Sequence, residues 1–248
     1  MLPGCREGRA INLGVAVALM LAFTGCSGAT SSSHPAPPRV QLASCSVEGV
    51  ARAALCGSYE VWENRASARG RRIPLNIVVI PAAGRDRQKD PVYYFDGGPG
   101  VAATSSARRI SALLPLVSQS RDLVFVDLRG TGRSHPLNCA VLPDDAPLPR
   151  HLDEFLSDDY VRECLARQDA DVRFYTQPIA VDDINEVRAA LGHERINVFG
   201  ASAGSRQAQL YMRRHPSSVR SASFTAFSPW MRRCRCRSLA PWMEVFAH

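Results

Sequence analysis

Apolar residues are distributed along the chain in two patterns, short runs typical of strands and a wider spacing typical of helices. Two β-branched runs, residues 59–64 and 72–82, predict two early strands that pair in antiparallel fashion. Short and almost entirely apolar runs further along predict strands that are buried on both faces. These later runs are residues 91–95, 123–126, 195–200 and 219–227.

Three segments between these runs have the three-to-four-residue apolar spacing of amphipathic helices. They are residues 151–170, 180–194 and 203–215. In the second segment Gly192 is placed to end the helix. The apolar face of that helix is predicted to consist of Val181, Ile184, Val187 and Leu191.

Buried strands separated by helices require right-handed crossover connections and give a mainly parallel sheet. We find no internal repeat and no sign of a second core in the sequence. The pattern therefore predicts one domain of the α/β class, preceded by a segment of different composition.

The first 25 residues have the pattern of an export signal. Two arginines precede an apolar stretch, residues 10–23, which is too short to span a bilayer comfortably and is followed by small residues. The letters FTGC at its end resemble a bacterial lipobox, which would make Cys26 a lipidated first mature residue that anchors the chain to a membrane face. An ordinary secretory signal is the alternative. Residues 26–44 are rich in Ser and Pro and predict a tether.

Export changes how the cysteines are interpreted, because disulfides persist outside the cytoplasm. The local pairs that we expect are Cys45 with Cys56 and Cys139 with Cys164, although spacing alone leaves their connectivity open. Cys234 and Cys236 are too close for an easy mutual bridge and have no companion metal pair. We therefore expect neither a metal nor a cofactor.

The formal net charge of +7 raises the question of nucleic-acid binding. Of the 30 basic residues only Lys89 is a lysine, and this bias, together with abundant Ala, Gly and Pro, is typical of a GC-rich coding sequence. The arginines are also scattered along the chain, apart from a cluster at 232–237. We expect no nucleic-acid partner.

The segment GASAGS, residues 200–205, fits the pattern G-x-S-x-G between a predicted strand and a predicted helix. Such a sharp turn forces its serine into a strained conformation that presents the hydroxyl to a crevice. Gly200 and Gly204 are needed where strand and helix pass too closely for a Cβ. Ser202 is therefore the candidate nucleophile, and a simple Gly/Ser-rich loop is the alternative.

The segment FDGGPG, residues 95–100, supplies the second part of an acyl-transfer site. A tetrahedral intermediate carries an oxyanion that needs two convergent backbone N–H donors. We expect one from Ala203, at the positive end of the new helix, and the other from Gly98 in the glycine loop. In the later segment VDLRGTGRS, Asp127 and Arg129 are interpreted as structural residues that brace loops at the same edge.

Three motifs in order, GGPG, DLRGTGRS and the segment 182–221 around the elbow, resemble the proline iminopeptidases of the α/β-hydrolase family, and most of all their secreted tripeptidyl-aminopeptidase-like branch. The resemblance covers residues 45–223. It implies an eight-stranded sheet with a cap domain and hydrolysis at peptide N-termini or of related esters and amides. It implies Ser202 as nucleophile, with Gly98 and Ala203 as oxyanion donors. Position 203 departs from the family, which commonly has Tyr or another large residue there.

A serine nucleophile needs a base that is oriented by a carboxylate, and in this fold both follow the serine in the chain. The only such residues after Ser202 are His215, Glu244 and His248. His215 lies 13 residues further along the same helix, about 20 Å away. His248 has the wrong spacing from Glu244, and His135, after a buried strand, is a further alternative.

The segment 228–248 departs from the family pattern and is rich in Arg, Cys and Trp without periodicity. We therefore expect residues 45–227 to be the N-terminal part of an α/β-hydrolase domain in a truncated or frameshifted chain with little activity. The expected partners are a peptide or a small amide or ester, and a membrane through Cys26, with the protein in the cell envelope or secreted. The alternatives are a non-catalytic exported lipoprotein that retains a partial hydrolase scaffold, and an Arg-rich binder.

Overall fold

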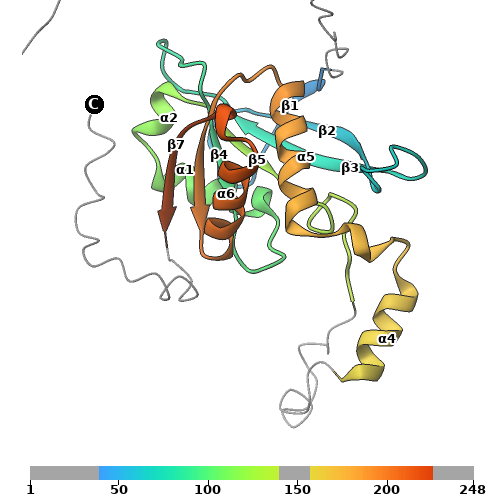
Figure 1. Cartoon of the computed structure of the whole chain (residues 1–248). Coiled ribbons are helices and arrows are strands. Elements are labelled where there is room, and N and C mark those ends of the chain that lie inside the picture. The colour runs from blue at the N-terminus through green and yellow to red at the C-terminus, as the bar shows by residue number, and fades with distance from the viewer. Residues whose placement is uncertain (1–38, 140–156, 226–248) are drawn as a thin grey trace, which may run out of the picture. The chain divides into compact units, whose positions relative to one another are not determined.

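The computed structural model describes residues 39–139 and 157–225, which form a seven-stranded sheet flanked by helices (Figure 1). The strands are β1 (Leu42–Cys45), β2 (Ala54–Trp62), β3 (Arg72–Ile80), β4 (Val92–Phe95), β5 (Leu123–Val126), β6 (Ile196–Ala201) and β7 (Val219–Thr225). The α-helices are α1 (Ala107–Leu113), α2 (Val117–Ser120), α4 (Asp158–Arg167), α5 (Gln177–Ala190) and α6 (Ala203–Arg214). Short 3-10 turns are η1 (Ala103–Ser106), η2 (Val172–Phe174) and η3 (Pro216–Ser218).

The sheet has the strand order β1-β2-β3-β5-β4-β6-β7. The pairs β1/β2, β2/β3 and β3/β5 are antiparallel, whereas β5/β4, β4/β6 and β6/β7 are parallel. Consequently β2, β4, β5, β6 and β7 run in one direction, and β1 and β3 run in the other. This arrangement confirms the α/β class with a mostly parallel sheet, and it confirms the antiparallel pairing of the two early strands.

The first strand lies in a segment that the sequence pattern assigned to the tether. Leu42–Cys45 pairs with β2 from Leu42 opposite Gly57 to Cys45 opposite Ala54. Only four residues long and half exposed, β1 has too short an apolar run to be recognised in the sequence. The sheet therefore begins before the predicted boundary at residue 45.

Two apolar clusters, one on each face of the sheet, account for the nearly continuous apolar runs of the central strands. On one face Tyr93 and Phe95 pack with residues of α5 and α6, which cross in front of the strands in Figure 1. On the other face Val92 and Tyr94 pack with Ile110 of α1. Because β4 is covered on both sides, all four of its residues are buried.

The later helices follow the predicted spacing, with displaced ends. In α5, Val181, Ile184 and Val187 are buried as predicted, and Leu191 packs partly buried against the same cluster. Gly192 follows the helix with φ +78°, and the N–H of His193 donates to the carbonyl of Arg188, 3.0 Å away. This is the hydrogen bond of a glycine C-terminal cap, so the predicted stop is confirmed.

One predicted helix differs in its bounds, and two observed helices were not predicted. The first predicted helix is observed as α4, Asp158–Arg167, which has no buried residue, while positions 151–156 lie outside the described residues. The sequence pattern missed α1 and α2 between β4 and β5, because their apolar positions are few and Leu113 and Leu116 are exposed.

Candidate active site

A sharp turn joins β6 to α6 and carries Ser202 at its corner. Ser202 has φ 51° and ψ −121°, a conformation that costs a non-glycine residue about 1–3 kcal/mol. The turn is held because the N–H of Ser202 donates to the carbonyl of Thr225 at the end of β7, 2.9 Å away. Ser202 is exposed although its strand is buried. The predicted strand–turn–helix context is therefore present.

Close backbone packing explains the two glycines that flank this turn. A Cβ on Gly200 would lie 2.8 Å from the carbonyl oxygen of Gly204, and a Cβ on Gly204 would overlap the carbonyl oxygens of Phe95 and Asp96. Backbone atoms cannot move aside as the end of a side chain can. The first turn of α6 thus packs directly on the end of β4, which brings the glycine loop after β4 to Ser202.

In the loop after β4, Gly97 lies against Ser202, since a Cβ there would lie 3.0 Å from the Ser202 Cβ and 3.5 Å from its Oγ. Its N–H is already used, because it donates to Asp96 Oδ1 at 2.7 Å. The N–H of Gly98 has no hydrogen-bond acceptor within residues 39–139 and 157–225, and Gly98 has φ +106°, which favours glycine.

The N–H of Ala203 is the first of α6 and likewise has no acceptor among the described residues. The N–H groups of its neighbours Ser202 and Ser205 are used, by Thr225 and by the carbonyl of Ser202 respectively. Near the exposed hydroxyl, the uncommitted backbone donors thus include Gly98 and Ala203, the two residues that the sequence suggested.

Asp96 is a residue of this site that sequence reasoning did not single out. Its Oδ1 accepts from the hydroxyl of Tyr94 at 2.9 Å as well as from Gly97, and Arg109 Nη2 lies 3.7 Å away. The side chain is 8 % exposed, and its Oδ2 has no partner among the described groups. A carboxylate directly before a glycine loop at the end of a buried strand was the available signal. Asp96 holds the glycine loop by accepting the hydrogen bond of the Gly97 N–H, the backbone donor just before that of Gly98.

Asp127 braces two loops at the same edge of the sheet, as the sequence suggested. Its fully buried carboxylate accepts from the N–H of Thr104 at 2.9 Å, from the Thr104 hydroxyl at 3.0 Å and from Asn76 Nδ2 at 2.9 Å. The N–H of Arg133 contributes a longer hydrogen bond of 3.3 Å. Asp127 therefore ties the turn after the glycine loop to β3 and to the loop after β5.

Arg129 acts as a second buried brace. Its Nε and Nη2 donate to Asp183 of α5 at 2.6 and 2.9 Å. Three carbonyl groups accept its remaining N–H groups, those of Trp62, Glu63 and Phe174. Burial raises the pKa of Asp183, although the hydrogen bonds and charges of Arg129 and Arg65 oppose that rise. The loop after β5 is thereby fixed to β2 and α5.

The two described histidines that the sequence offered as bases, His215 and His135, make hydrogen bonds with residues other than Ser202. His215 lies just after the other end of α6, where its Nε2 is 2.9 Å from Asp182 Oδ1. Burial lowers the pKa of His215 despite that carboxylate. His135 Nδ1 is 2.7 Å from the hydroxyl of Tyr175, which donates to Glu63. In the described parts of the chain no hydrogen bond joins the Ser202 hydroxyl to a histidine.

Both predicted disulfides are present. Cys45–Cys56 joins β1 to β2, and Cys139–Cys164 joins the loop after β5 to α4, with Cα–Cα distances of 5.8 and 5.5 Å. Such bonds are typical of proteins outside the cytoplasm. Cys26, the predicted signal at 1–25 and the tail at 228–248 lie outside the described residues.

Two further properties of residues 39–139 and 157–225 bear on other functions. No group of three or more His, Cys, Asp or Glu side chains there is arranged to hold a metal ion. None of the helices in these ranges has the length and apolar character needed to cross a membrane.

Comparison with known proteins finds relatives of this chain. The tripeptidyl aminopeptidase of Streptomyces lividans is 28% identical over 180 residues, which cover 66% of this chain and 34% of that protein. The proline iminopeptidase of Neisseria gonorrhoeae is 30% identical over 130 residues, covering 52% of this chain and 30% of that protein. The chain thus spans about a third of the length of these curated relatives.

Among solved structures, the proline iminopeptidase of Mycobacterium smegmatis is 24% identical with a TM-score of 0.46, and the match covers 71% of this chain and 46% of that one. The model of the alpha/beta hydrolase fold family matches residues 90–232, from β4 through the turn at Ser202 and beyond β7. The chain therefore belongs to the alpha/beta hydrolase fold family.

Proposed function

We propose that Ser202 is the nucleophile of a serine hydrolase site that acts through an acyl-enzyme on peptide, amide or ester substrates. The observation that carries the proposal is the exposed, strained Ser202 with two uncommitted N–H groups in its surroundings. One belongs to Ala203, the next residue, and the other to Gly98, which follows Gly97 in the loop that approaches Ser202. The relatives named tripeptidyl aminopeptidase and proline iminopeptidase favour a substrate with a free peptide N-terminus.

In the proposed reaction, the Ser202 Oγ attacks the substrate carbonyl carbon, and the carbonyl oxygen becomes an oxyanion that accepts hydrogen bonds from Gly98 and Ala203. Collapse of this intermediate expels the amine or alcohol with a proton and leaves an ester on Ser202. Water then attacks the ester and releases the acid. The positive end of α6 further favours the negative charge at this position.

We propose that the reaction is slow in this chain. A hydroxyl without a base must lose its proton to water or hydroxide, and the described histidines are bound to Asp182, Tyr175 and Tyr93. Oxyanion stabilisation alone leaves an acceleration on the order of 10³–10⁴ over water in serine proteases that lack triad residues. The competing proposal, a non-catalytic exported lipoprotein with a hydrolase scaffold, is favoured by the same absence of a contacting base among the described residues.

Phosphonylation of the purified chain by a fluorophosphonate, mapped by mass spectrometry, tests the proposal. We expect adduct on Ser202, formed slowly and at a rate that rises steadily with pH because hydroxide supplies the base. Ser202→Ala should abolish the adduct, whereas Ser217→Ala, which removes another exposed serine, should not change it. Absence of Ser202 adduct would favour the non-catalytic lipoprotein. A rate that reaches a plateau near neutral pH would reveal a histidine base and contradict the slow reaction.

We also propose that the chain is exported and anchored by lipid at Cys26. The two disulfides and the signal pattern of residues 1–25 support export. Metabolic labelling with a radioactive fatty acid tests the anchor: Cys26→Ser should remove the label, and Cys5→Ser should leave it in place.

A further inference from the structure

The edge of the sheet opposite Ser202 gathers basic side chains. Strands β4, β5, β6 and β7 are parallel, so their first residues share one edge, and Ser202, after β6, lies at the other. The six residues of β6 separate the two edges by about 17 Å. The loop 81–91 lies at the first edge because it joins the end of β3 to the start of β4. We define the basic edge by Arg87, Lys89, Arg195 and Arg220.

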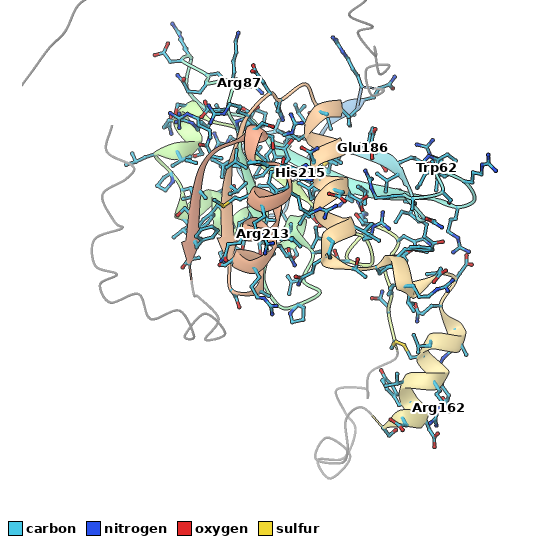
Figure 2. The ribbon with its side chains drawn as sticks, in the orientation of Figure 1. Trp62, Arg87, Arg162, Glu186, Arg213 and His215 are labelled. Carbon is cyan, nitrogen blue, oxygen red and sulfur yellow. A yellow bond between two sulfur atoms is a disulfide. The ribbon has the colours of Figure 1, made fainter. Side chains whose placement is uncertain are left out.

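A hollow of about 490 Å³ lies at the basic edge between three segments, residues 87–90, 194–195 and Arg220. Figure 2 labels Arg87 at this edge, beyond the strands. The hollow contains four cationic side chains and two acidic ones, Asp90 and Glu194. Three arginines that lie far apart in the sequence are thus brought together by the fold.

The carboxylates near the hollow are mostly used within the protein. Asp90 Oδ2 lies 3.0 Å from Arg121 Nε and 3.2 Å from Arg220 Nε, and it also accepts from Asn197 Nδ2 at 2.8 Å. Burial disfavours ionisation of Asp90, but these hydrogen bonds and charges outweigh burial and lower its pKa. The buried Asp122 pairs with Arg87. Asp122 therefore neutralises charge on Arg87, and Asp90 neutralises charge on Arg121 and Arg220.

Two cations of the basic edge have no carboxylate partner in the described parts of the chain. Lys89 is exposed and makes no hydrogen bond or ion pair there. Arg195 is exposed, and its Nη2 donates only to the carbonyl oxygen of Val219, 2.8 Å away. Glu194 is the one carboxylate of the hollow without a cationic partner among those residues. An excess of positive charge consequently faces solvent.

The first described residues of the chain lie close to the segment that leads into β6 at this edge. The N–H of Val40 donates to the carbonyl of Ala190 at the end of α5, just before β6 begins. The exposed Arg39 lines a second hollow of about 580 Å³ with residues of 189–192. Cys26 stands 13 residues before Arg39, a length of chain that reaches at most about 45 Å. If Cys26 carries a lipid, as proposed above, Arg39 lies within that distance of the bilayer.

We propose that the basic edge docks on an anionic phospholipid surface, with the Ser202 edge turned away from the bilayer. Guanidinium groups pair with phosphate oxygens in a matched, bidentate geometry. The cations stand on three separate segments around an open hollow, which suits many headgroup phosphates in a plane better than a single small anion. The attraction acts over about a Debye length, so a tether that keeps the chain near the bilayer strengthens it without being its source.

Vesicle sedimentation of the full chain tests the proposal. Every variant carries Cys26→Ser, so that no acyl chain contributes to binding. We expect the chain to bind vesicles of phosphatidylcholine with phosphatidylglycerol and not vesicles of phosphatidylcholine alone. Lys89→Gln together with Arg195→Gln should weaken binding about 30-fold, because each cation at an anionic surface contributes a factor of about five. Lys89→Gln alone, which disturbs no described contact, should weaken it about fivefold.

The matched control is Arg162→Gln with Arg167→Gln, which removes the same charge from exposed positions on α4. Equal loss of binding in this control would overturn the proposal, because net charge and not the basic edge would then be responsible. Failure to bind phosphatidylglycerol vesicles would also overturn it, as would binding of single-stranded DNA without vesicle binding. Displacement from vesicles by inorganic phosphate at equal phosphate concentration would indicate a soluble anion site and equally contradict docking. Ser202→Ala should leave vesicle binding unchanged, so this result is independent of the proposed hydrolase site.

Discussion

Replacing Arg129 by methionine tests whether the buried ion pair of Arg129 with Asp183 stabilises the fold. The side chains of Arg129 and Asp183 are each 1 % exposed, so the substitution leaves a buried carboxylate with Arg65 as its remaining cationic partner. Breaking a buried pair in this way costs about 3–5 kcal/mol. Three carbonyl groups also lose their donor, which adds to the cost.

Urea unfolding followed by circular dichroism measures this loss in the free energy of unfolding. The double variant Arg129→Met with Asp183→Asn should lose less than the sum of the two single variants, with a coupling of at least about 2 kcal/mol, because it leaves no unpaired charge. The matched control is Arg162→Met, whose ion pairs with Asp158 and Asp159 are exposed, and it should unfold like the parent chain.

The sign of the pH dependence gives a second check. Folding raises the pKa of Asp183, and loss of Arg129 should raise it further. A carboxyl with a raised pKa binds a proton in the folded state and loses stability as the pH rises through that range. The Arg129→Met loss should therefore be smaller at about pH 5 than at about pH 8. A loss below about 1 kcal/mol at neutral pH, or the opposite pH trend, would refute the assignment of Arg129 and Asp183 as a buried brace.

Three further changes should alter the stability of the folded chain. Burial lowers the pKa of His193 to about 4, so stability should fall by up to about 3 kcal/mol as the pH drops from about 6.5 towards 4, and His193→Gln should remove that dependence in urea titrations. Replacing Cys45 and Cys56 by serine should lower the free energy of unfolding by about 3 kcal/mol, and a change below about 1 kcal/mol would contradict it. Gly204→Ala should lower the melting temperature far more than Gly192→Ala, which meets no atom within 4 Å; equal effects would exclude the close packing at Gly204.

Sequence reasoning located the elements whose burial is set by their own residues. The apolar runs at 123–126 and 195–200 and the face of α5 are such cases, since nearly every position there is buried in the sheet or against it. The strand β1 and the helix α1 escaped because few of their positions are buried, so packing by neighbours, rather than local pattern, defines them.

The candidate residues could be named from the sequence because the turn that carries Ser202 is determined by the residues next to it. A strained serine between two glycines is a local device, and Ser202, Gly98 and Ala203 could be named from short motifs. Asp96 was missed because its role depends on the Gly97 N–H and the Tyr94 hydroxyl, which only the folded loop places around it. The contact of Tyr175 with both Glu63 and His135 joins residues far apart in the chain and leaves no signal in spacing.

The most direct test of the central claim is a crystal structure of the chain after phosphonylation at Ser202. The phosphoryl oxygen stands where the oxyanion of the tetrahedral intermediate would be. We predict that it accepts hydrogen bonds of about 2.7–3.1 Å from the backbone N–H groups of Gly98 and Ala203. A phosphoryl oxygen that points to solvent, or that binds other donors while these two N–H groups stay apart, would contradict the proposed oxyanion site.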